Sequence, residues 1–215
     1  MTKTNQQKVK DFLINNGVII VMFILVIYTG FTSDNFFTKN NFMNILMNMS
    51  SRLVIALGIA GCVITAGCDL SAGRMIGFGA CISGMLLQRM DYSGKFFPDM
   101  QPLNVFVVAL IAMLVCAAFG TVTGFFIAYL NVPPFIATLA MMEIVYGIGL
   151  IVTNATPLGG YVEQYTNVSN GKFLGINYLI WIAIIVAVIT WFIFNMTRHG
   201  KYMYAIGGNP QAAEV

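Results

Sequence analysis

One short polar segment holds the residues of this chain with the clearest chemical potential. It reads TAGCDLSAGR over residues 65–74 and places Asp69, Ser71 and Arg74 between two apolar stretches. A carboxylate and a guanidinium in such surroundings are costly unless they pair or face water, and interrupted helices often build substrate sites in transporters. A short loop explains the same residues equally well: Asp69 would cap the next helix, with Ser71 near its first turn. Both interpretations remain open.

Two further charged residues lie beside or within apolar runs. Glu143 lies in FIATLAMMEIVYGIGLIVT, and an acid in such a place either lines a pathway or pairs inside a helix bundle. Arg52 stands between an amphipathic stretch and an apolar run, from which its long side chain can reach the membrane surface. We therefore count five residues as candidates for a translocation pathway: Asp69, Ser71, Arg74, Arg52 and Glu143.

A third polar segment ends the sequence and reads RHGKYMYAIGGNPQAAEV over residues 198–215. Gly207 and Gly208 are predicted to end one helical segment, while Asn209 and Pro210 are predicted to begin another. The new helix has only residues 210–215, and so short a helix is unstable alone in water. We therefore expect that the sequence continues beyond this point; a frayed tail is the alternative.

The rest of the sequence is the apolar scaffold that must position these residues. Of 215 residues, 58% are hydrophobic and 9% are charged, whereas an ordinary soluble domain has roughly 25% charged residues. The mean hydropathy is +0.81. So few charges exclude a soluble enzyme, a disordered chain and a nucleic-acid binder with a basic face. A lipid bilayer is the natural solvent of such a chain.

Apolar segments predict the helices that cross this bilayer. An amphipathic stretch over 41–53 runs on into the second of six segments, which is rich in the Gly and Ala residues that let membrane helices approach closely. The fourth segment contains Gly120 and Gly124 at GxxxG spacing. The third segment is about 20 Å long and too short to cross alone, so motif residues extend it or it belongs to a broken helix. The six segments are about 12–31, 54–67, 75–87, 104–130, 135–152 and 178–194.

We therefore expect an all-α polytopic membrane protein with about six transmembrane helices, one of them short or broken. A small excess of Lys and Arg places both ends of the chain in the cytoplasm. The predicted parts are a cytoplasmic N-terminal segment (1–11), a transmembrane bundle (12–194) and a cytoplasmic loop (195–215).

Several common sites are absent from the sequence. It contains no G-x-x-x-x-G-K-[ST], H-E-x-x-H or G-x-S-x-G motif, which disfavours ATP binding through a P-loop and common hydrolase chemistry. The cysteines form no C-x-x-C pair, and we interpret them as small packing residues rather than metal ligands or disulfides. They are Cys62, Cys68, Cys81 and Cys116.

Several segments resemble a known family, and the resemblance covers essentially the whole chain. The tail is similar to the cytoplasmic coupling loop of permease subunits in bacterial sugar ABC importers of the ribose and galactoside branch. TAGCDLSAGR resembles the GxDLSxG signature of that family, and AYLNVPPFIATLAMM over 128–142 matches a further block. The galactoside members are the most similar, through RLVIALGIAG, LLQRM and FPDM.

The resemblance implies a multi-pass subunit of the bacterial inner membrane that moves a monosaccharide such as galactose or methylgalactoside. It implies a second permease copy, a cytoplasmic ABC ATPase subunit that hydrolyses ATP in trans, and a periplasmic sugar-binding protein. The chain would then contact lipid, would not be an enzyme and would need no cofactor, metal or nucleic acid. Family members continue with further spans, so we expect a shortened chain here. The residues implied in ATPase coupling are Tyr204, Gly207, Gly208, Asn209, Pro210, Ala212 and Ala213.

Two other functions fit the residues alone. An ion-coupled secondary transporter would use Asp69 and Glu143 and would work without an ATPase. A membrane receptor or assembly subunit that does not transport would bind its partners independently of any substrate.

Overall fold

The computed structural model describes residues 13–213, so the predicted segment 1–11 lies outside the described residues. The chain divides into two compact units, with the boundary after Asn48. This boundary falls inside the long helix α3 (Lys39–Ile64), which contributes to both units.

The first unit joins α2 (Gly17–Thr32) to the beginning of α3 through a polar turn. Thr38 marks the start of α3, because its hydroxyl oxygen accepts a hydrogen bond from the backbone N–H of Asn41 (3.3 Å). A hydroxyl in this place satisfies one of the backbone donors that a helix leaves unpaired at its first turn.

The second unit contains the remainder of α3 and all later elements. Its only sheet among the described residues is a short antiparallel hairpin, in which Lys172 pairs with Asn177. The elements after α3 are α4 (Ala72–Leu86), α5 (Val105–Leu130), α6 (Pro134–Thr153), α7 (Glu163–Asn170), β1 (Lys172–Phe173), β2 (Ile176–Asn177), α8 (Tyr178–Met196), α9 (Arg198–Gly208) and α10 (Pro210–Ala213).

Six apolar helices match the six predicted segments. Within residues 13–213, four helices are long and apolar enough to cross a membrane, namely α3, α5, α6 and α8. The helices α2 and α4 are apolar but shorter, with 16 and 15 residues. The predicted all-α membrane fold with one short helix is confirmed, and a second short helix accompanies it.

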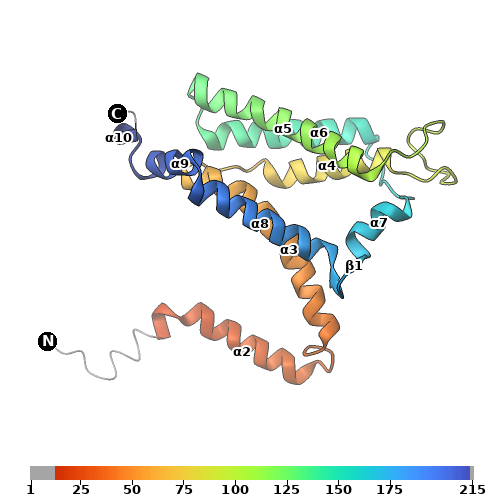
Figure 1. Ribbon diagram of the computed structural model, residues 1–215, viewed down its shortest axis with the longest axis horizontal. Helices are drawn as coiled ribbons and strands as arrows, with labels where there is room; N and C mark the ends of the chain where they lie inside the picture. Colours follow the sequence, from red (N-terminus) through yellow and green to blue (C-terminus); the bar gives the residue numbers. More distant parts are fainter. Residues whose placement is uncertain (1–12, 214–215) are drawn as a thin grey trace. The chain divides into compact units, whose positions relative to one another are not determined.

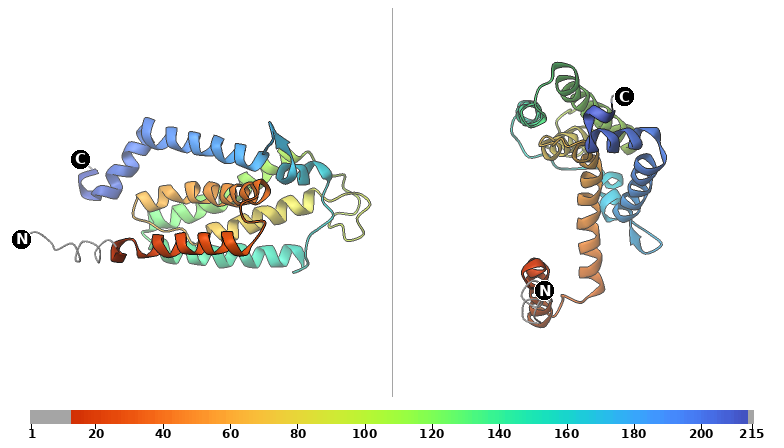
Figure 2. Two further views of the ribbon diagram at one scale, coloured as in Figure 1. Left: turned by 90° about the horizontal axis from the view of Figure 1, so that it is seen from below. Right: turned by 90° about the vertical axis from the view of Figure 1, so that its left-hand side faces the viewer.

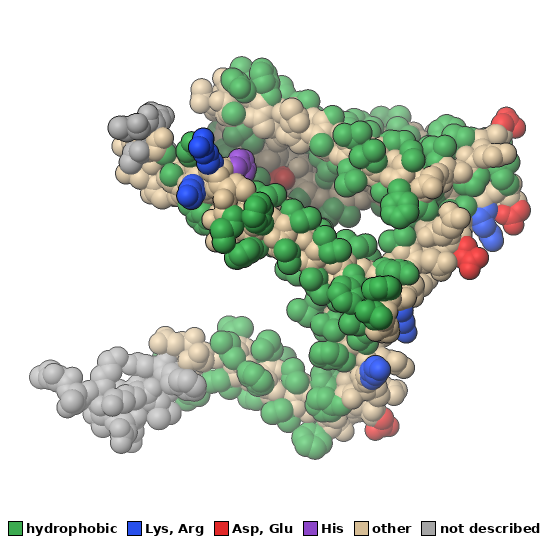
Figure 3. Space-filling model, viewed as in Figure 1, with side chains coloured by type: hydrophobic (Ala, Val, Ile, Leu, Met, Phe, Trp, Pro, Cys, Tyr) green, Lys and Arg blue, Asp and Glu red, His purple; other side chains and the backbone are tan. Residues whose placement is uncertain are grey.

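Helices α4, α5 and α6 run side by side and enclose the core of the second unit (Figure 1). Phe78 and Ile82 of α4 pack there with Ala112 of α5 and with Met141 and Val145 of α6. Most other apolar side chains of these helices face outward, and in Figure 3 hydrophobic side chains cover most of the visible face of α5 and α8. Such a surface suits lipid or further membrane helices.

Asparagine side chains begin two of the membrane helices. The side-chain oxygen of Asn104 accepts a hydrogen bond from the N–H of Phe106 (2.9 Å) at the start of α5. Asn177 does the same with the N–H of Leu179 (2.8 Å) at the start of α8. Both caps satisfy donors that would otherwise be unpaired where the helix enters the membrane.

In helix α3 the amphipathic stretch and the apolar run after it form one continuous helix, as the sequence predicted. No proline interrupts residues 39–64, so nothing forces a break there. The helix ends just before Ala66, whose φ of +59° is left-handed and stops the helical path.

Helix α4 begins at Ala72, so Ala72, Gly73 and Arg74 of the motif extend the short third segment. Between α6 and α8 the chain also forms α7 and the β1–β2 hairpin, which the sequence did not predict.

Gly120 and Gly124, which have the GxxxG spacing, make no close helix contact within the described part of this chain. A Cβ atom at either glycine would meet no described atom within 4 Å. The two glycines instead border open space between helices, so they make room rather than contact.

A buried glutamine holds together the loops that follow the C-terminal ends of α4 and α6. Gln88 is 1% exposed. Its side-chain N–H donates to the carbonyl of Gly159 (3.0 Å), and its side-chain oxygen accepts from the N–H of Phe96 (2.6 Å). Beside it, the N–H of Arg89 donates to the carbonyl of Gly160 (2.8 Å). Residues 88–96 and 159–160 are therefore one cross-linked layer, named here the Gln88 clamp.

Tyr161 lies next to the Gln88 clamp. Its hydroxyl donates to the carbonyl of Leu158 (2.8 Å), and its ring meets that of Tyr165 edge to face at 5.5 Å. Burial raises the pKa of the Tyr161 phenol, and the neighbouring Tyr165 raises it further. The folded chain therefore favours the neutral phenol.

Candidate functional site

The candidate site is the turn between α3 and α4, which the motif TAGCDLSAGR forms. After the left-handed Ala66, the N–H of Gly67 donates back to the carbonyl of Cys62 (2.8 Å). The hydroxyl of Thr65 bonds to the carbonyl of the same Cys62 (3.0 Å). These bonds satisfy carbonyl groups that the end of α3 leaves without helical partners.

Asp69 and Ser71 are bonded to each other within this turn. One carboxylate oxygen of Asp69 accepts the backbone N–H of Ser71 at 2.9 Å and its hydroxyl at 2.6 Å. Ser71 is buried, with 5% of its surface exposed. Both bonds end on Oδ1, and within residues 13–213 no hydrogen bond to Oδ2 is present.

The predicted capping role of Asp69 is wrong in its position. The residue before α4 is Ser71, and its side chain makes no capping bond to the helix. Asp69 lies two residues earlier, and its carboxylate instead bonds to Ser71. Short acidic side chains commonly form local turns of this kind.

Two cavities adjoin this turn, and Asp69, Ser71 and Gly120 line both of them. The larger cavity has a volume of about 450 Å³ and lies between α3, α4 and α5. The smaller has a volume of about 260 Å³ and extends past Cys62 and Cys68 to the start of α6. The Asp69–Ser71 turn therefore separates two spaces that follow one another along the bundle.

The walls of the larger cavity are mainly apolar, so Asp69 and Ser71 are its chief polar groups. Its other walls come from Val54, Ile55, Gly58, Ile59, Ala72, Met75, Ile76, Gly79, Ala112, Met113 and Cys116. An apolar pocket with a few polar groups is the usual form of a small-molecule site. A carboxylate oxygen here can accept hydrogen bonds from the hydroxyl groups of a solute.

Arg74 is directed to another neighbour. Its guanidinium carbon lies 4.0 Å from the ring centre of Tyr146 on α6, in a cation–π contact. Arg74 does not line either of the two cavities. The structure thus brings Asp69 and Ser71 together and turns Arg74 away from them.

Arg52 and Glu143 are also separate from the turn. Both side chains are exposed, Arg52 halfway along α3 and Glu143 halfway along α6. Neither lines the two cavities, and among residues 13–213 no ion pair joins either to an opposite charge.

The predicted coupling segment forms two helices. Helix α9 ends at Gly208 and α10 begins at Pro210, as the sequence predicted. Figure 2 shows α9 turning away from the direction of α8. Tyr204, Gly208, Asn209 and Ala213 are exposed, whereas Gly207 is half-buried.

Sequence reasoning missed several residues that line the smaller cavity. Thr123 and Thr138 are both buried there, and each hydroxyl bonds to the carbonyl four residues before it. Their only signal was a hydroxyl inside an apolar run, which many membrane helices carry without a functional reason.

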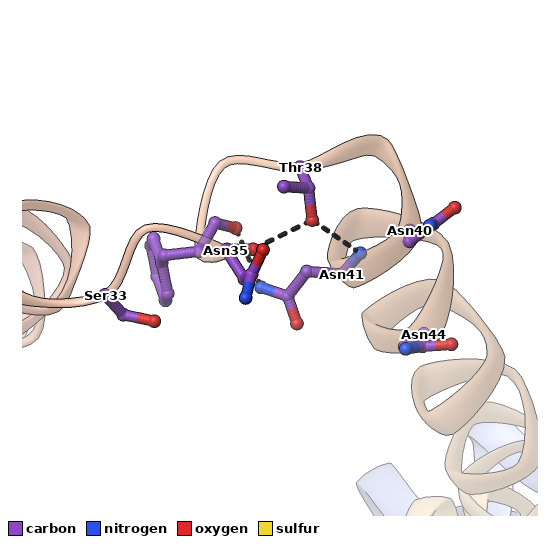
Figure 4. Close-up of a pocket in the computed structure, with 7 residues that line it drawn as sticks. Ser33, Asn35, Thr38, Asn40, Asn41 and Asn44 are labelled. Carbon is purple, nitrogen blue, oxygen red and sulfur yellow. Dashed lines mark hydrogen bonds between the residues drawn. The ribbon is translucent and has the colours of Figure 1, made fainter.

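A separate polar cavity of about 430 Å³ lies in the first unit, at the turn between α2 and α3. Figure 4 shows Thr38 bridging Asn35 and Asn41, and the side chain of Asn41 also bonds to the carbonyl of Phe36 (2.8 Å). These bonds shape the turn itself. The lining residues are Ser33, Asn35, Phe36, Thr38, Asn40, Asn41 and Asn44.

Comparisons with known proteins agree on one family. The family described as "Branched-chain amino acid transport system / permease component" matches residues 41–215. The galactose/methyl galactoside import permease protein of Escherichia coli (strain K12) is 39% identical over 222 residues, with 100% of this chain and 66% of the relative covered.

Two other relatives are similar. The protein with the same description from Haemophilus influenzae is 40% identical, with the same two coverages of 100% and 66%. The ribose import permease protein of Escherichia coli (strain K12) is 31% identical, with 96% of this chain and 62% of the relative covered. No solved structure matches the chain. The chain thus spans slightly less than two thirds of the length of these relatives.

Proposed function

Because this chain belongs to the family described as the permease component of the branched-chain amino acid transport system, we propose that it is the transmembrane permease subunit of an ATP-driven ABC importer. Its relatives are named for galactose, methyl galactoside and ribose import. We therefore propose a monosaccharide such as galactose or methylgalactoside as its cargo, carried across the bacterial inner membrane.

The observation that carries this proposal is the pair of cavities on either side of the Asp69–Ser71 turn. A neutral sugar has several hydroxyl groups and no charge, so it needs hydrogen-bond acceptors in a site that is otherwise apolar. Asp69 Oδ2 supplies such an acceptor, and Ser71 holds the carboxylate in place through Oδ1. The sugar would pass this turn on its way from the larger cavity to the smaller one.

The proposed partners lie on both sides of the membrane. A cytoplasmic ATPase subunit would bind the exposed surface of α9 and α10, including Tyr204, Asn209 and Ala213. A periplasmic sugar-binding protein would deliver the cargo to the opposite ends of the helices, where the Gln88 clamp lies. A second permease copy would cover part of the apolar helix surface. In this orientation the N-terminus is cytoplasmic.

This function assigns ATP hydrolysis to the partner. Closure of two ATPase subunits around nucleotide would move the coupling segment, and the bundle would change between states open to either side. The chain itself would bind and orient the sugar and would keep other solutes from leaking across the membrane. It would perform no covalent chemistry.

Transport in proteoliposomes tests this proposal. The vesicles would contain the complete gene product, its ATPase subunit and its sugar-binding protein, with labelled galactose outside and ATP available to the ATPase. We expect uptake that requires ATP and is competed by methylgalactoside. Uptake driven by an ion gradient without the ATPase would contradict the proposal and support a secondary transporter.

A substitution in the candidate site provides a second test. Asp69→Asn keeps the size of the side chain but weakens its acceptor strength, and we expect galactose uptake to fall about tenfold, since hydrogen bonds to charged groups contribute roughly 1.5–3 kcal/mol. Asp99→Asn, in the exposed loop before α5, is the matched control and should transport normally.

A further inference from the structure

Two neighbouring glycines of the coupling segment have opposite surroundings. A Cβ atom on Gly207 would overlap the carbonyl oxygen of Ile64, and it would lie 2.9 Å from the carbonyl carbon of the same residue. A Cβ atom on Gly208 would meet no described atom within 4 Å. Gly207 is therefore pressed against the last residue of α3, whereas Gly208 faces open space.

A second contact holds α9 against the same end of α3. The terminal methyl carbon of Met203 would lie 2.9 Å from a Cβ atom on Gly61, so this glycine also makes room for α9. Met203 and Gly207 lie four residues apart and thus on one face of α9. Gly61 and Ile64 share a face of α3 in the same way. Each helix therefore contributes one glycine to the contact, Gly207 from α9 and Gly61 from α3.

The end of α3 leads directly into the candidate site. From Ile64 the chain passes through Thr65, the left-handed Ala66 and Gly67, which are bonded back to the final turn of α3. Asp69 follows two residues later. A shift of the Ile64 carbonyl therefore displaces a short, internally bonded turn rather than a free loop.

We propose that Gly207 transmits movement of the coupling segment to the Asp69–Ser71 turn, while Gly208 belongs to the surface that meets the ATPase. This inference rests on the proposed function and deepens it. Because backbone meets backbone at Gly207, the two helices move together when α9 is pushed or pulled. Alanine there would force α9 away from Ile64 and loosen the contact without changing the exposed surface of α9 and α10.

The test compares Gly207→Ala with Gly208→Ala in the complete permease complex. The first measurement is association of the ATPase subunit during purification. The second is the rate at which a small maleimide modifies the native Cys68, which lines the smaller cavity, with and without ATP. Fragment mass spectrometry distinguishes Cys68 from Cys62.

We expect the wild-type complex to change its Cys68 modification rate on ATP addition. Gly207→Ala should retain the ATPase and reduce this ATP response about fivefold or more, because coupling energies between linked sites are typically 1–3 kcal/mol. Gly208→Ala should weaken ATPase association, and the complexes that retain the ATPase should show the wild-type ATP response. Equal ATP responses in Gly207→Ala and the wild type would overturn the inference.

A third variant guards against misfolding of Gly207→Ala. Met203→Ala removes atoms from the second contact and adds none, so it should fold and show a reduced ATP response with normal ATPase association. A full response in a folded Met203→Ala would overturn the inference even if Gly207→Ala failed to fold. If the wild type retained no ATPase at all, the proposed function itself would be wrong.

Discussion

Ser71 donates two hydrogen bonds to a single oxygen of Asp69, one from its backbone at 2.9 Å and one from its hydroxyl at 2.6 Å. A carboxylate held in this way keeps one oxygen for the protein, and Asp69 also lines both cavities beside the turn. We therefore propose separate roles for the two residues: Ser71 would position the carboxylate, and Asp69 would accept hydrogen bonds from the solute.

Removing the hydroxyl of Ser71 tests this arrangement. Ser71→Ala keeps the backbone bond to Asp69 but loses the bond to a charged acceptor, and we expect a loss of about 1–2 kcal/mol in the free energy of unfolding. Denaturant titration in detergent measures it. Ser51→Ala, on the exposed face of α3, should change the same free energy by less than about 0.5 kcal/mol.

The proposed positioning role of Ser71 also predicts how the same variant binds sugar. Galactose should bind Ser71→Ala more weakly at equal ATPase association, because the carboxylate of Asp69 is less well held. Unchanged affinity together with reduced stability would assign Ser71 to the fold alone.

The buried Gln88 predicts a strong effect in the clamp. Gln88→Ala would leave the N–H of Phe96 and the carbonyl of Gly159 without their partner, and such groups cost about 1–3 kcal/mol each when buried. We expect faster cleavage of the loop over 88–103 by a protease added from outside. The exposed Gln101 lies in the same loop, and Gln101→Ala should be cleaved like the wild type.

The contact between Arg74 and Tyr146 predicts a small effect that depends on the ring. Tyr146→Phe keeps an aromatic face for the guanidinium and should leave stability unchanged. Tyr146→Leu should lower the free energy of unfolding by about 0.5–1 kcal/mol, the range for exposed cation–π contacts. Equal losses in both variants would mean that the phenol hydroxyl, and not the ring, supports Arg74.

Tyr161 predicts a dependence of stability on pH. Burial raises the pKa of its phenol in the folded chain, whereas in the unfolded chain the pKa is about 10. The unfolded state therefore loses the proton first as the pH rises. The contribution of Tyr161 is fully present below pH about 10 and is lost as the pH rises through the folded pKa.

Unfolding midpoints measured in detergent between neutral pH and pH about 11 check this sign. The wild type should lose stability more steeply than Tyr161→Phe over the alkaline part of that range. Parallel curves for the two proteins would show that another group controls the alkaline loss.

Local sequence signals predicted where the helices lie. Apolar runs fixed α5, α6 and α8 almost to the residue, because Asn104 and Asn177 cap two of them and Pro134 begins the third. Pro210 likewise predicted the start of α10. Such signals act within one turn of the chain, so the sequence alone contains them.

The direction of side chains depended on packing between distant segments. Nothing near Arg74 in the sequence indicates that it faces Tyr146, and nothing in the pair Gly207–Gly208 indicates which of the two meets α3. Likewise, the GxxxG spacing alone does not indicate that Gly120 and Gly124 border the smaller cavity. Spacing gives the face of a helix but not its neighbour.

The short length of α4 affects the thickness of the apolar layer that a solute would have to cross. Its 15 residues extend about 22 Å at the usual rise, while the hydrocarbon core of a bilayer is about 30 Å thick. We propose that the irregular backbone of residues 65–71 lies at membrane depth, where unpaired backbone groups are tolerated only beside protein or water-filled space. In the proposed permease the apolar layer would be thinner at this turn, and a hydroxylated solute would meet polar contacts before it had crossed the lipid.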